Sequence, residues 1–456
     1  MREINTIFSS LFESLDECIA EKTICETIKL FIADYYASAI AGYRINRSFN
    51  EAIMSIVEES SGKAESSVFC CNKKYPCEQA AFMNAIYAHG ADMDDGNKKS
   101  MGHIAAHTMS AVFALAETLD VTWGDVLVAI NAGYEVFNRI AAAAQPGLAH
   151  RGFHSTGMAG GMACAAACAK LMKLNTEGIC SAISIAAVQS SGLFIITESG
   201  QECKPLNPAN AARVGIISAK LAQRGIKGPN HVLHHPKGWF HAVTDQVNED
   251  MMTEGLGEYF TIHDSYLKPY PSCRHTHSVI ECAVNIRKQL IEAYSSEYAG
   301  NIETINVYIY PNAIRVAGQI IRPENPEDAK FSVHYALAIA LMKGQFALSD
   351  LDTENAPTEI GALIDKINIV LDDRWENVRE GIRGAKVEVM TRDKGVYSCY
   401  VNTPKGEGSN PFTEEDIESK LRGCAEGILT EKQQHELLLT IKNIDSAKKY
   451  TPIRIG

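Results

Sequence analysis

Three absences in this 456-residue sequence exclude whole classes of protein. No CxxC pair occurs, which argues against zinc ribbons and thioredoxin-type redox chemistry. Every apolar stretch is interrupted by serine, glycine or charge before it reaches membrane-spanning length, so we expect no membrane span. Basic residues are in deficit, with 43 Lys and Arg against 55 Asp and Glu, and no basic run with interleaved aromatics is present. The net charge of −12 therefore disfavours nucleic-acid binding.

The cysteines and the N-terminal sequence bear on the compartment. Thirteen irregularly spaced cysteines are odd in number, so they cannot all pair in intrachain disulfides. The opening residues MREINTIFSSLFESLDE contain acids and lack the continuous apolar core of a signal peptide. Both features predict reduced thiols and a cytoplasmic location. An acidic protein can still bind an anionic small molecule, but only where Lys, Arg or His gather locally.

The chain up to about residue 266 reads as a series of apolar helices. They are predicted over residues 23–43, 78–89, 103–119, 123–143, 156–174, 177–193 and 209–224. Many are apolar nearly all round, which is typical of interior helices of a large bundle. The run GMAGGMACAAACAK, residues 157–170, is not preceded by a β-rich strand, so its small residues favour close helix packing over a phosphate-binding turn.

Beyond Tyr266 the pattern changes. TINVYIY, residues 304–310, alternates in the manner of a half-buried strand. Two further strands, 385–390 and 396–402, flank a predicted hairpin turn. A helix over 332–342 and tail helices over 413–421 and 431–441 complete the assignment. We predict a mainly α fold: a large all-α helical domain from 1–266 and 405–456, and a smaller α+β lid domain from 267–404. The cleft between such domains is a natural place for a small ligand.

An acidic loop is the most informative local feature. Asp92, Asp94 and Asp95 crowd around Gly96, and His103 follows at the start of an Ala-rich helix. Acids this close repel one another, so at least one should titrate abnormally. Perturbed carboxylates beside a histidine indicate proton chemistry. The alternative is a solvated acidic loop with a helix-capping Asp.

Four further patches place ionisable groups among turn or helix-start signals. His154 lies just before the small-residue helix, where a helix N-terminus favours the neutral imidazole; the alternative is a surface-loop histidine. Lys204 could supply positive charge to a carboxylate, although most lysines face solvent. Lys268 begins a proline-stiffened stretch that also carries His277. Tyr335 could present a phenol to a cleft or be an ordinary core tyrosine.

Together these motifs resemble the MmgE/PrpD family, whose members include 2-methylcitrate dehydratases, cis-aconitate decarboxylase and iminodisuccinate epimerases. The resemblance covers nearly the whole chain. It is carried by the segments Asp92-Met93-Asp94-Asp95, Met101-Gly102-His103, Arg151-Gly152-Phe153-His154, Cys203-Lys204, Lys268-Pro269-Tyr270-Pro271, Ala329-Lys330-Phe331-Ser332 and Gly406-Glu407-Gly408-Ser409-Asn410-Pro411. Departures from the family pattern include Ile104 in place of a proline, Gly96 in place of a threonine and Cys273 where decarboxylase-like members carry a histidine. These departures leave the substrate open and make cis-aconitate decarboxylation a less favoured reading than a generic lyase.

The resemblance implies a site and an architecture. Asp92, His103 and His154 are implied to transfer protons, with Tyr335 reaching in from the smaller domain. Lys204, Lys268 and His277 are the predicted substrate-binding residues. The family further implies a homodimer that needs no metal and no organic cofactor.

The sequence therefore predicts a cofactor-independent lyase, a dehydratase or a decarboxylase, acting on a small di- or tricarboxylate. Three alternatives stay open. The first is an epimerase that uses two bases. The second is a metallohydrolase built on His103 and His107, although Ile104 stands where such sites place a glutamate. The third is a dimeric interaction protein without catalysis.

Overall fold

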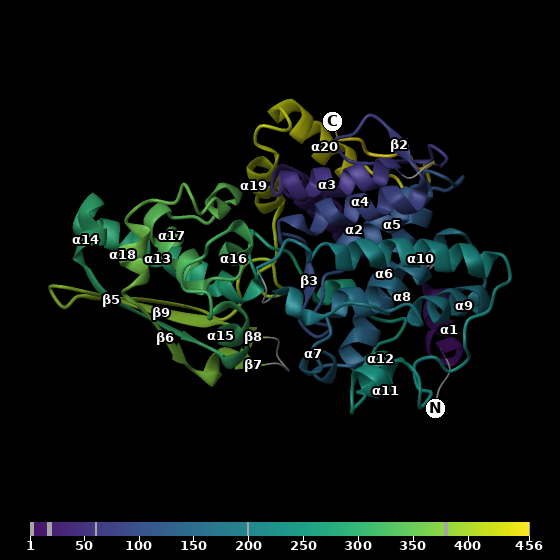
Figure 1. The fold of residues 1–456 in the computed structure, drawn as a ribbon, viewed down its shortest axis with the longest axis horizontal. Coiled ribbons are helices and arrows are strands. Elements are labelled where there is room, and N and C mark those ends of the chain that lie inside the picture. Colours follow the sequence, from purple (N-terminus) through teal and green to yellow (C-terminus); the bar gives the residue numbers. More distant parts are fainter. Residues whose placement is uncertain (1–3, 16–20, 60–61, 198–199, 378–381, 456) are drawn as a thin grey trace. The chain divides into compact units, whose positions relative to one another are not determined.

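The computed structural model describes residues 4–15, 21–59, 62–197, 200–377 and 382–455 (Figure 1). The chain divides into two units that are each described by themselves. Unit 1 comprises residues 1–195, 203–267 and 413–456, and unit 2 comprises residues 196–202 and 268–412. In the part of the chain that is described, none of the helices combines the length and the apolar character that a membrane span requires.

Unit 1 consists almost entirely of helices. The α-helices of its described residues are α1 (Ile4–Ser14), α2 (Lys22–Arg44), α3 (Arg47–Glu59), α4 (Cys77–Gly90), α5 (Ala105–Ala116), α6 (Trp123–Ala143), α7 (Gly147–His150), α8 (Ser155–Leu171), α9 (Thr176–Ala187), α10 (Leu206–Gln223), α11 (Trp239–Val243), α12 (Glu249–Thr253), α19 (Glu414–Ala425) and α20 (Glu431–Lys442). Two short antiparallel pairs join them: β1 (Ser66–Ser67) with β2 (Lys74–Tyr75), and β3 (Gly96–Asn97) with β4 (Ser265–Tyr266).

Small residues set the close helix packing of unit 1. A Cβ at Gly160 on α8 would lie 2.9 Å from the Cβ of Ala211 on α10, and one at Gly215 on α10 would lie 2.1 Å from the Cβ of Cys164. The small-residue run is therefore a helix-packing surface, as the sequence predicts. A Cβ at Gly42 on α2 would similarly collide with the carbonyl of Tyr87 on α4. That crossing fixes α2 against the helix that leads into the acidic loop.

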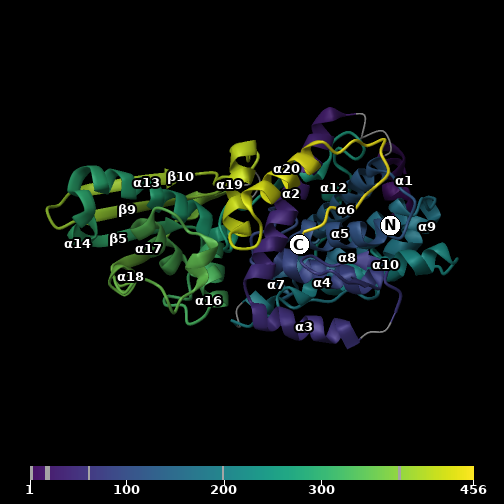
Figure 2. The same ribbon diagram turned by 90° about the horizontal axis from the view of Figure 1, so that it is seen from above.

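Unit 2 is built on a four-stranded mixed sheet in the order β10-β9-β5-β6. The strands are β5 (Ile302–Ile309), β6 (Ile367–Leu371), β9 (Ala385–Thr391) and β10 (Val396–Val401); β5 and β6 are parallel, and the other pairs are antiparallel. Helix α13 (His277–Tyr294) packs on β9 and β10 and against α17 (Val333–Lys343), an arrangement that can be followed in Figure 2. The smaller elements are α14 (Tyr298–Asn301), α15 (Pro311–Ala317), α16 (Pro326–Lys330), α18 (Ile360–Ile364), β7 (Glu376–Asn377) and β8 (Ile382–Arg383).

The predicted mainly helical fold class is confirmed. The helix predicted over 123–143 is α6, and the predicted hairpin is β9 with β10. The proposed domain limits compare with the units as follows: unit 2 resumes at Lys268, close to the predicted 267, but the chain returns to unit 1 at Thr413 rather than at 405. Residues 196–202, assigned from sequence to the helical domain, group with unit 2. A short excursion of this kind carries no periodicity that could have revealed it.

Candidate active site

The acidic loop of unit 1 is buried. It follows α4, and the exposed fractions of Asp92, Asp94 and Asp95 are 3%, 0% and 0%. The alternative of a solvated acidic loop is therefore wrong. Buried carboxylates need partners because desolvation penalises their charge. Each of the three acids has such partners within unit 1.

Asp92 joins a lysine and a histidine that are remote in the sequence. The ammonium of Lys204 donates to Oδ1 of Asp92 at 2.7 Å. Nε2 of His103 lies 4.0 Å from the same oxygen. Lys204 sits in the turn just before α10, and its side chain is 7% exposed. This lysine is thus a buried cation at the acidic loop rather than one of the many lysines that face solvent.

Asp94 is surrounded by two imidazoles. Its Oδ2 lies 2.7 Å from Nδ1 of His89, the penultimate residue of α4, and 3.6 Å from Nδ1 of His103. The centroids of the two imidazole rings are 4.8 Å apart. A carboxylate between two imidazoles holds the orientation of both rings.

The tautomer of His103 follows from its own hydrogen bond. Nδ1 of His103 lies 2.7 Å from the backbone carbonyl of Asp95. Because a carbonyl oxygen only accepts, Nδ1 carries the hydrogen. In the neutral ring, Nε2 is then the basic nitrogen, and this is the nitrogen on the side of Asp92. His103 is therefore arranged as a proton acceptor.

Asp95 caps α5 and titrates abnormally. Its Oδ1 accepts from the backbone N–H groups of Ile104 and Ala105, at 3.2 and 2.9 Å, and its Oδ2 accepts from the Tyr134 hydroxyl at 2.7 Å. Burial, followed by the neighbouring charge of Asp94, raises the pKa of Asp95 to about 7, although the Ala105 N–H and the Tyr134 hydroxyl oppose the shift. The expectation that one of the crowded acids is perturbed is met here.

His154 is the N-cap residue of α8 and is 3% exposed, so the surface-loop alternative is wrong. The side-chain amide of Asn207 donates to its Nδ1 at 2.9 Å, which places the hydrogen of the neutral ring on Nε2. Burial, and then the charge of Lys204, lower the pKa of His154 well below its usual range. His154 therefore stays neutral and offers an N–H at Nε2. It has the opposite tautomer to His103.

A threonine links the two histidine segments. The hydroxyl of Thr156, in the first turn of α8, accepts from the backbone N–H of His103 at 3.1 Å. Asp92, His103, His154 and Lys204 are thus brought together by unit 1 alone.

The other three predicted site residues belong to unit 2. Lys268 is 1% exposed. The hydroxyl of the buried Tyr335 donates to the backbone carbonyl of Asp350 at 2.8 Å. His277 contacts the guanidinium of Arg274 at 3.0 Å and the carbonyl of Ser272 at 3.2 Å. These contacts engage Tyr335 and His277 within unit 2, and the site roles of all three residues stay predictions.

The paired-histidine metal site suggested by sequence spacing does not form. Helix α5 begins at Ala105, so His103 precedes the helix and does not share a helical face with His107. His107 is buried, with Nδ1 near the Thr108 hydroxyl at 3.0 Å and the Cys164 sulfur at 3.3 Å. A different group of possible metal ligands is present at the acidic loop. It consists of one ligand atom from each of His89, Asp94 and His103, and these three atoms lie within 4.8 Å of one another. Nδ1 of His89 is instead hydrogen-bonded to Asp94, and Nδ1 of His103 to the backbone carbonyl of Asp95.

Comparisons with known proteins identify the family of this chain. The MmgE/PrpD N-terminal domain matches residues 14–251, and the MmgE/PrpD C-terminal domain matches residues 270–446. The chain belongs to the MmgE/PrpD family. The first of these matches contains Asp92, His103, His154 and Lys204, the four predicted site residues of unit 1.

Relatives in this family carry names of lyases. A cis-aconitate decarboxylase-like protein of Aspergillus oryzae is 24% identical over 442 residues, which cover 93% of this chain and 91% of that protein. Human cis-aconitate decarboxylase is 27% identical over 386 residues, 82% of this chain and 77% of the relative. The 2-methylcitrate dehydratase of Escherichia coli is 24% identical over 214 residues, 46% of this chain and 44% of the relative. The chain is therefore a lyase-like member of the MmgE/PrpD family.

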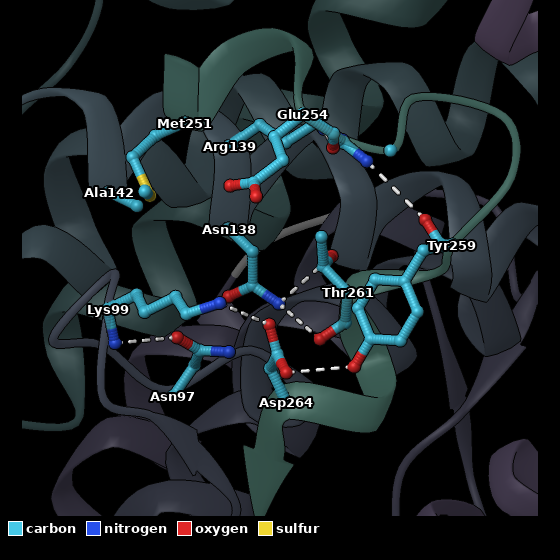
Figure 3. Close-up of a pocket in the computed structure, with 11 residues that line it drawn as sticks. Asn97, Lys99, Asn138, Arg139, Ala142, Met251, Glu254, Tyr259, Thr261 and Asp264 are labelled. Atoms are coloured by element: carbon cyan, nitrogen blue, oxygen red, sulfur yellow. Dashed lines mark hydrogen bonds and ion pairs between the residues drawn. The ribbon is translucent and has the colours of Figure 1, made fainter. Parts of the chain in front are cut away.

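A separate polar cavity of about 380 Å³ lies in unit 1 (Figure 3). The ammonium of Lys99 and the hydroxyl of Tyr259 both bind the carboxylate of Asp264, at 2.9 and 2.8 Å, and Asn138 bonds to Thr261. Many of its polar groups are thus paired with one another. It is lined by Asn97, Lys99, Asn138, Arg139, Ala142, Met251, Glu254, Gly255, Tyr259, Thr261 and Asp264. We assign it no role in the chemistry of this MmgE/PrpD protein.

Sequence reasoning missed three residues of the site. The sequence pattern predicts His89 only as the end of a helix, although its place five residues before Asp94 puts it at the same loop. Asn207 lies in the first turn of α10, just after Lys204, and its amide at a helix start is an available signal. Tyr134 is in the middle of α6, and nothing in the local sequence distinguishes it from a core tyrosine.

Proposed function

We propose that this protein is a cofactor-independent lyase, a dehydratase or decarboxylase, that acts on a small di- or tricarboxylate. One observation carries the proposal: the part-buried His103 and the buried His154 have opposite tautomers and lie around the Asp92–Lys204 ion pair. The decarboxylase and dehydratase names of the relatives support the substrate class.

Substrate binding would use buried cations. The ammonium of Lys204 holds Asp92 and can share its hydrogens with an incoming carboxylate. Lys268 and His277 are the proposed carboxylate contacts from the second family domain. The ammonium groups of Lys204 and Lys268 are the local cations that an acidic chain requires to bind an anion.

His103 is proposed as the proton-transfer base. Its Nε2 takes the proton from the carbon alpha to a substrate carboxylate, and Asp94 and Asp92 stabilise the resulting imidazolium. A general base of this kind contributes about 10²- to 10⁴-fold to the rate. If carbon dioxide leaves instead, His103 enters the step as an imidazolium that has taken its proton from solvent, and it gives this proton to the carbon that loses the carboxylate.

His154 is proposed as a neutral hydrogen-bond donor. Its Nε2–H stabilises negative charge on the departing hydroxyl or on a carboxylate oxygen of the intermediate. Burial keeps the ring uncharged, so the donor is present throughout the neutral pH range. Tyr335 is proposed as a further proton-transfer group. We also propose that the enzyme is a cytoplasmic homodimer that requires no metal.

A proton-NMR screen in deuterated buffer tests the proposal. Citrate, 2-methylcitrate, cis-aconitate, malate and iminodisuccinate are incubated with the purified protein. Loss of water or carbon dioxide from one of them is expected. Deuterium entering recovered substrate without either loss would select the epimerase alternative, and no change in any compound would contradict catalysis of this class.

Histidine variants connect the turnover to the site. His103→Gln and His154→Gln should lower kcat by about 10²-fold or more while retaining the melting temperature. The exposed His435 on α20 provides the matched control, because His435→Gln should leave kcat unchanged. Full activity in both site variants would refute the proposed roles.

A further inference from the structure

A buried lysine from the C-terminal part of the chain contacts the acidic loop. Lys420 on α19 donates to Oδ1 of Asp34 on α2 at 2.5 Å and to the backbone carbonyl of Met93 at 2.6 Å. Its side chain is 1% exposed, and that of Asp34 is 0% exposed. Met93 stands between Asp92 and Asp94. The ammonium therefore binds the backbone of the loop at the point from which both acids project.

The loop needs such a restraint because its backbone is unusual. Asp92 has a φ of +52°, in the left-handed region that non-glycine residues occupy infrequently. A conformation of this kind persists when surrounding contacts fix it. The hydrogen bond at the next carbonyl is one such contact, and the sulfur of Cys424 on α19 lies 3.9 Å from that of Met93.

The charge of Lys420 also fits the loop. Asp34, Asp92, Asp94 and Asp95 are four buried carboxyl groups in one region. Lys204 neutralises Asp92 from the side of α10, and Lys420 neutralises Asp34 from the side of α19. Without Lys420, the loop would lose the donor to the carbonyl of Met93, and Asp34 on α2 would lose its lysine partner.

We propose that Lys420, held by Asp34, is a positioning residue that fixes the acidic loop, so that Asp92 faces Lys204 and Asp94 faces the imidazoles of His89 and His103. The expected effect of Lys420 on kcat rests on the proposed function. The geometric content of the inference does not, because the arrangement of the two histidines can be measured without turnover.

The test uses a neutral replacement of the whole ion pair. Replacing Lys420 alone would leave Asp34 buried without its partner, which is strongly destabilising. The double variant Asp34→Asn/Lys420→Met removes both charges and the donor to Met93. A second double variant, Asp34→Asn/Lys420→Gln, keeps a neutral amide donor at the same place. A matched control, Glu135→Gln/Arg139→Met, removes another buried ion pair of unit 1, whose guanidinium reaches the carbonyls of Glu254 and Tyr259.

Two readouts are measured on the full chain. The first is the ¹⁵N spectrum of the histidine rings, assigned with single His→Gln variants, which reports tautomer and hydrogen bonding. The second is kcat and KM on the compound that the NMR screen identifies. In Asp34→Asn/Lys420→Met we expect altered ring signals of His89 and His103 and a kcat lowered about 100-fold, because a misplaced catalytic group costs about this factor. In Asp34→Asn/Lys420→Gln, the ring signals should lie closer to those of the wild type, and kcat should be partly restored.

The outcomes separate this inference from the proposed function. Unchanged His89 and His103 signals in the folded Met variant overturn the positioning role, and so do equal changes in the Glu135/Arg139 control. If the Met variant does not fold, the same comparison is made on the Gln variant, where native ring signals with reduced kcat would also overturn it. If the wild type converts no compound, the proposed function fails, and the ring signals still decide whether Lys420 holds the loop.

Discussion

The buried carboxyl of Asp95 predicts a pH dependence of stability with a definite sign. The pKa of Asp95 is raised from 3.8 to about 7, chiefly by burial and then by Asp94. Between these values the folded protein holds a proton that the unfolded chain has released. Stability contributed by Asp95 therefore falls as pH rises from about 4 to about 7, and then levels off.

The magnitude follows from the size of the shift. A difference of about 3 pKa units corresponds to about 4 kcal/mol over the full range, and about 2.5 kcal/mol of it falls between pH 5 and pH 8. Asp95→Asn keeps a neutral oxygen for the N–H groups of Ile104 and Ala105 and never ionises. It costs about 1 kcal/mol at acidic pH through its altered bond to Tyr134. By pH 8 the variant should be the more stable protein.

Urea denaturation at pH 5, 6, 7 and 8 measures this crossing. Trp123 and Trp239 lie in unit 1 and Trp375 lies in unit 2, so a Trp375→Phe background makes tryptophan fluorescence report on unit 1. Tyr134→Phe removes a hydroxyl that lowers the pKa of Asp95 and should move the transition to higher pH. A difference between Asp95→Asn and wild type that does not change with pH, or that changes in the opposite direction, would refute the reasoning.

Three further predictions concern individual side chains. Lys204→Met should raise KM at least 10-fold because it removes a carboxylate anchor. Lys220, a half-buried lysine of the same helical region that pairs with Glu78, provides the control, and Lys220→Met should leave KM unchanged. Equal KM values for the two variants in steady-state assays would contradict this prediction. His154 should show a neutral ring with its hydrogen on Nε2 by ¹⁵N NMR at pH 6, because burial lowers its pKa, and an imidazolium signal there would show the opposite. Tyr335→Phe should cost about 1 kcal/mol of stability through the lost bond to Asp350, and its predicted catalytic role requires kcat to fall at least 10-fold as well; an unchanged kcat would leave Tyr335 as a core residue of unit 2.

The sequence predicted the helical part of the fold well because apolar periodicity is a local signal. The helix that is now α6 was predicted with its observed limits, and the hairpin of β9 and β10 was predicted from its turn residues. Helix α13 and strand β6 were not predicted. The first begins at His277, inside a stretch interpreted as a binding segment, and β6 is short, with several exposed positions.

The candidate site was only partly accessible to the same reasoning. Asp92, His103, His154 and Lys204 were found because each stands at a turn or a helix start and matches a family segment. Their neighbours in the site come from helix interiors or helix ends: His89 bonds to Asp94, Asn207 to His154 and Tyr134 to Asp95. Their function depends on which other helix each one faces, and that is a tertiary property. Lys420 is further from the loop in sequence and carries no local signal at all.

The contact between α19 and the acidic loop also has a consequence for biosynthesis. Lys420 follows Met93 by 327 residues, so the loop leaves the ribosome well before the lysine whose ammonium binds its backbone. The helices around the acidic loop can therefore form while the loop still lacks one of its backbone hydrogen bonds. Synthesis of α19, rather than collapse of the early helices, would then mark the moment at which the complete site can first form.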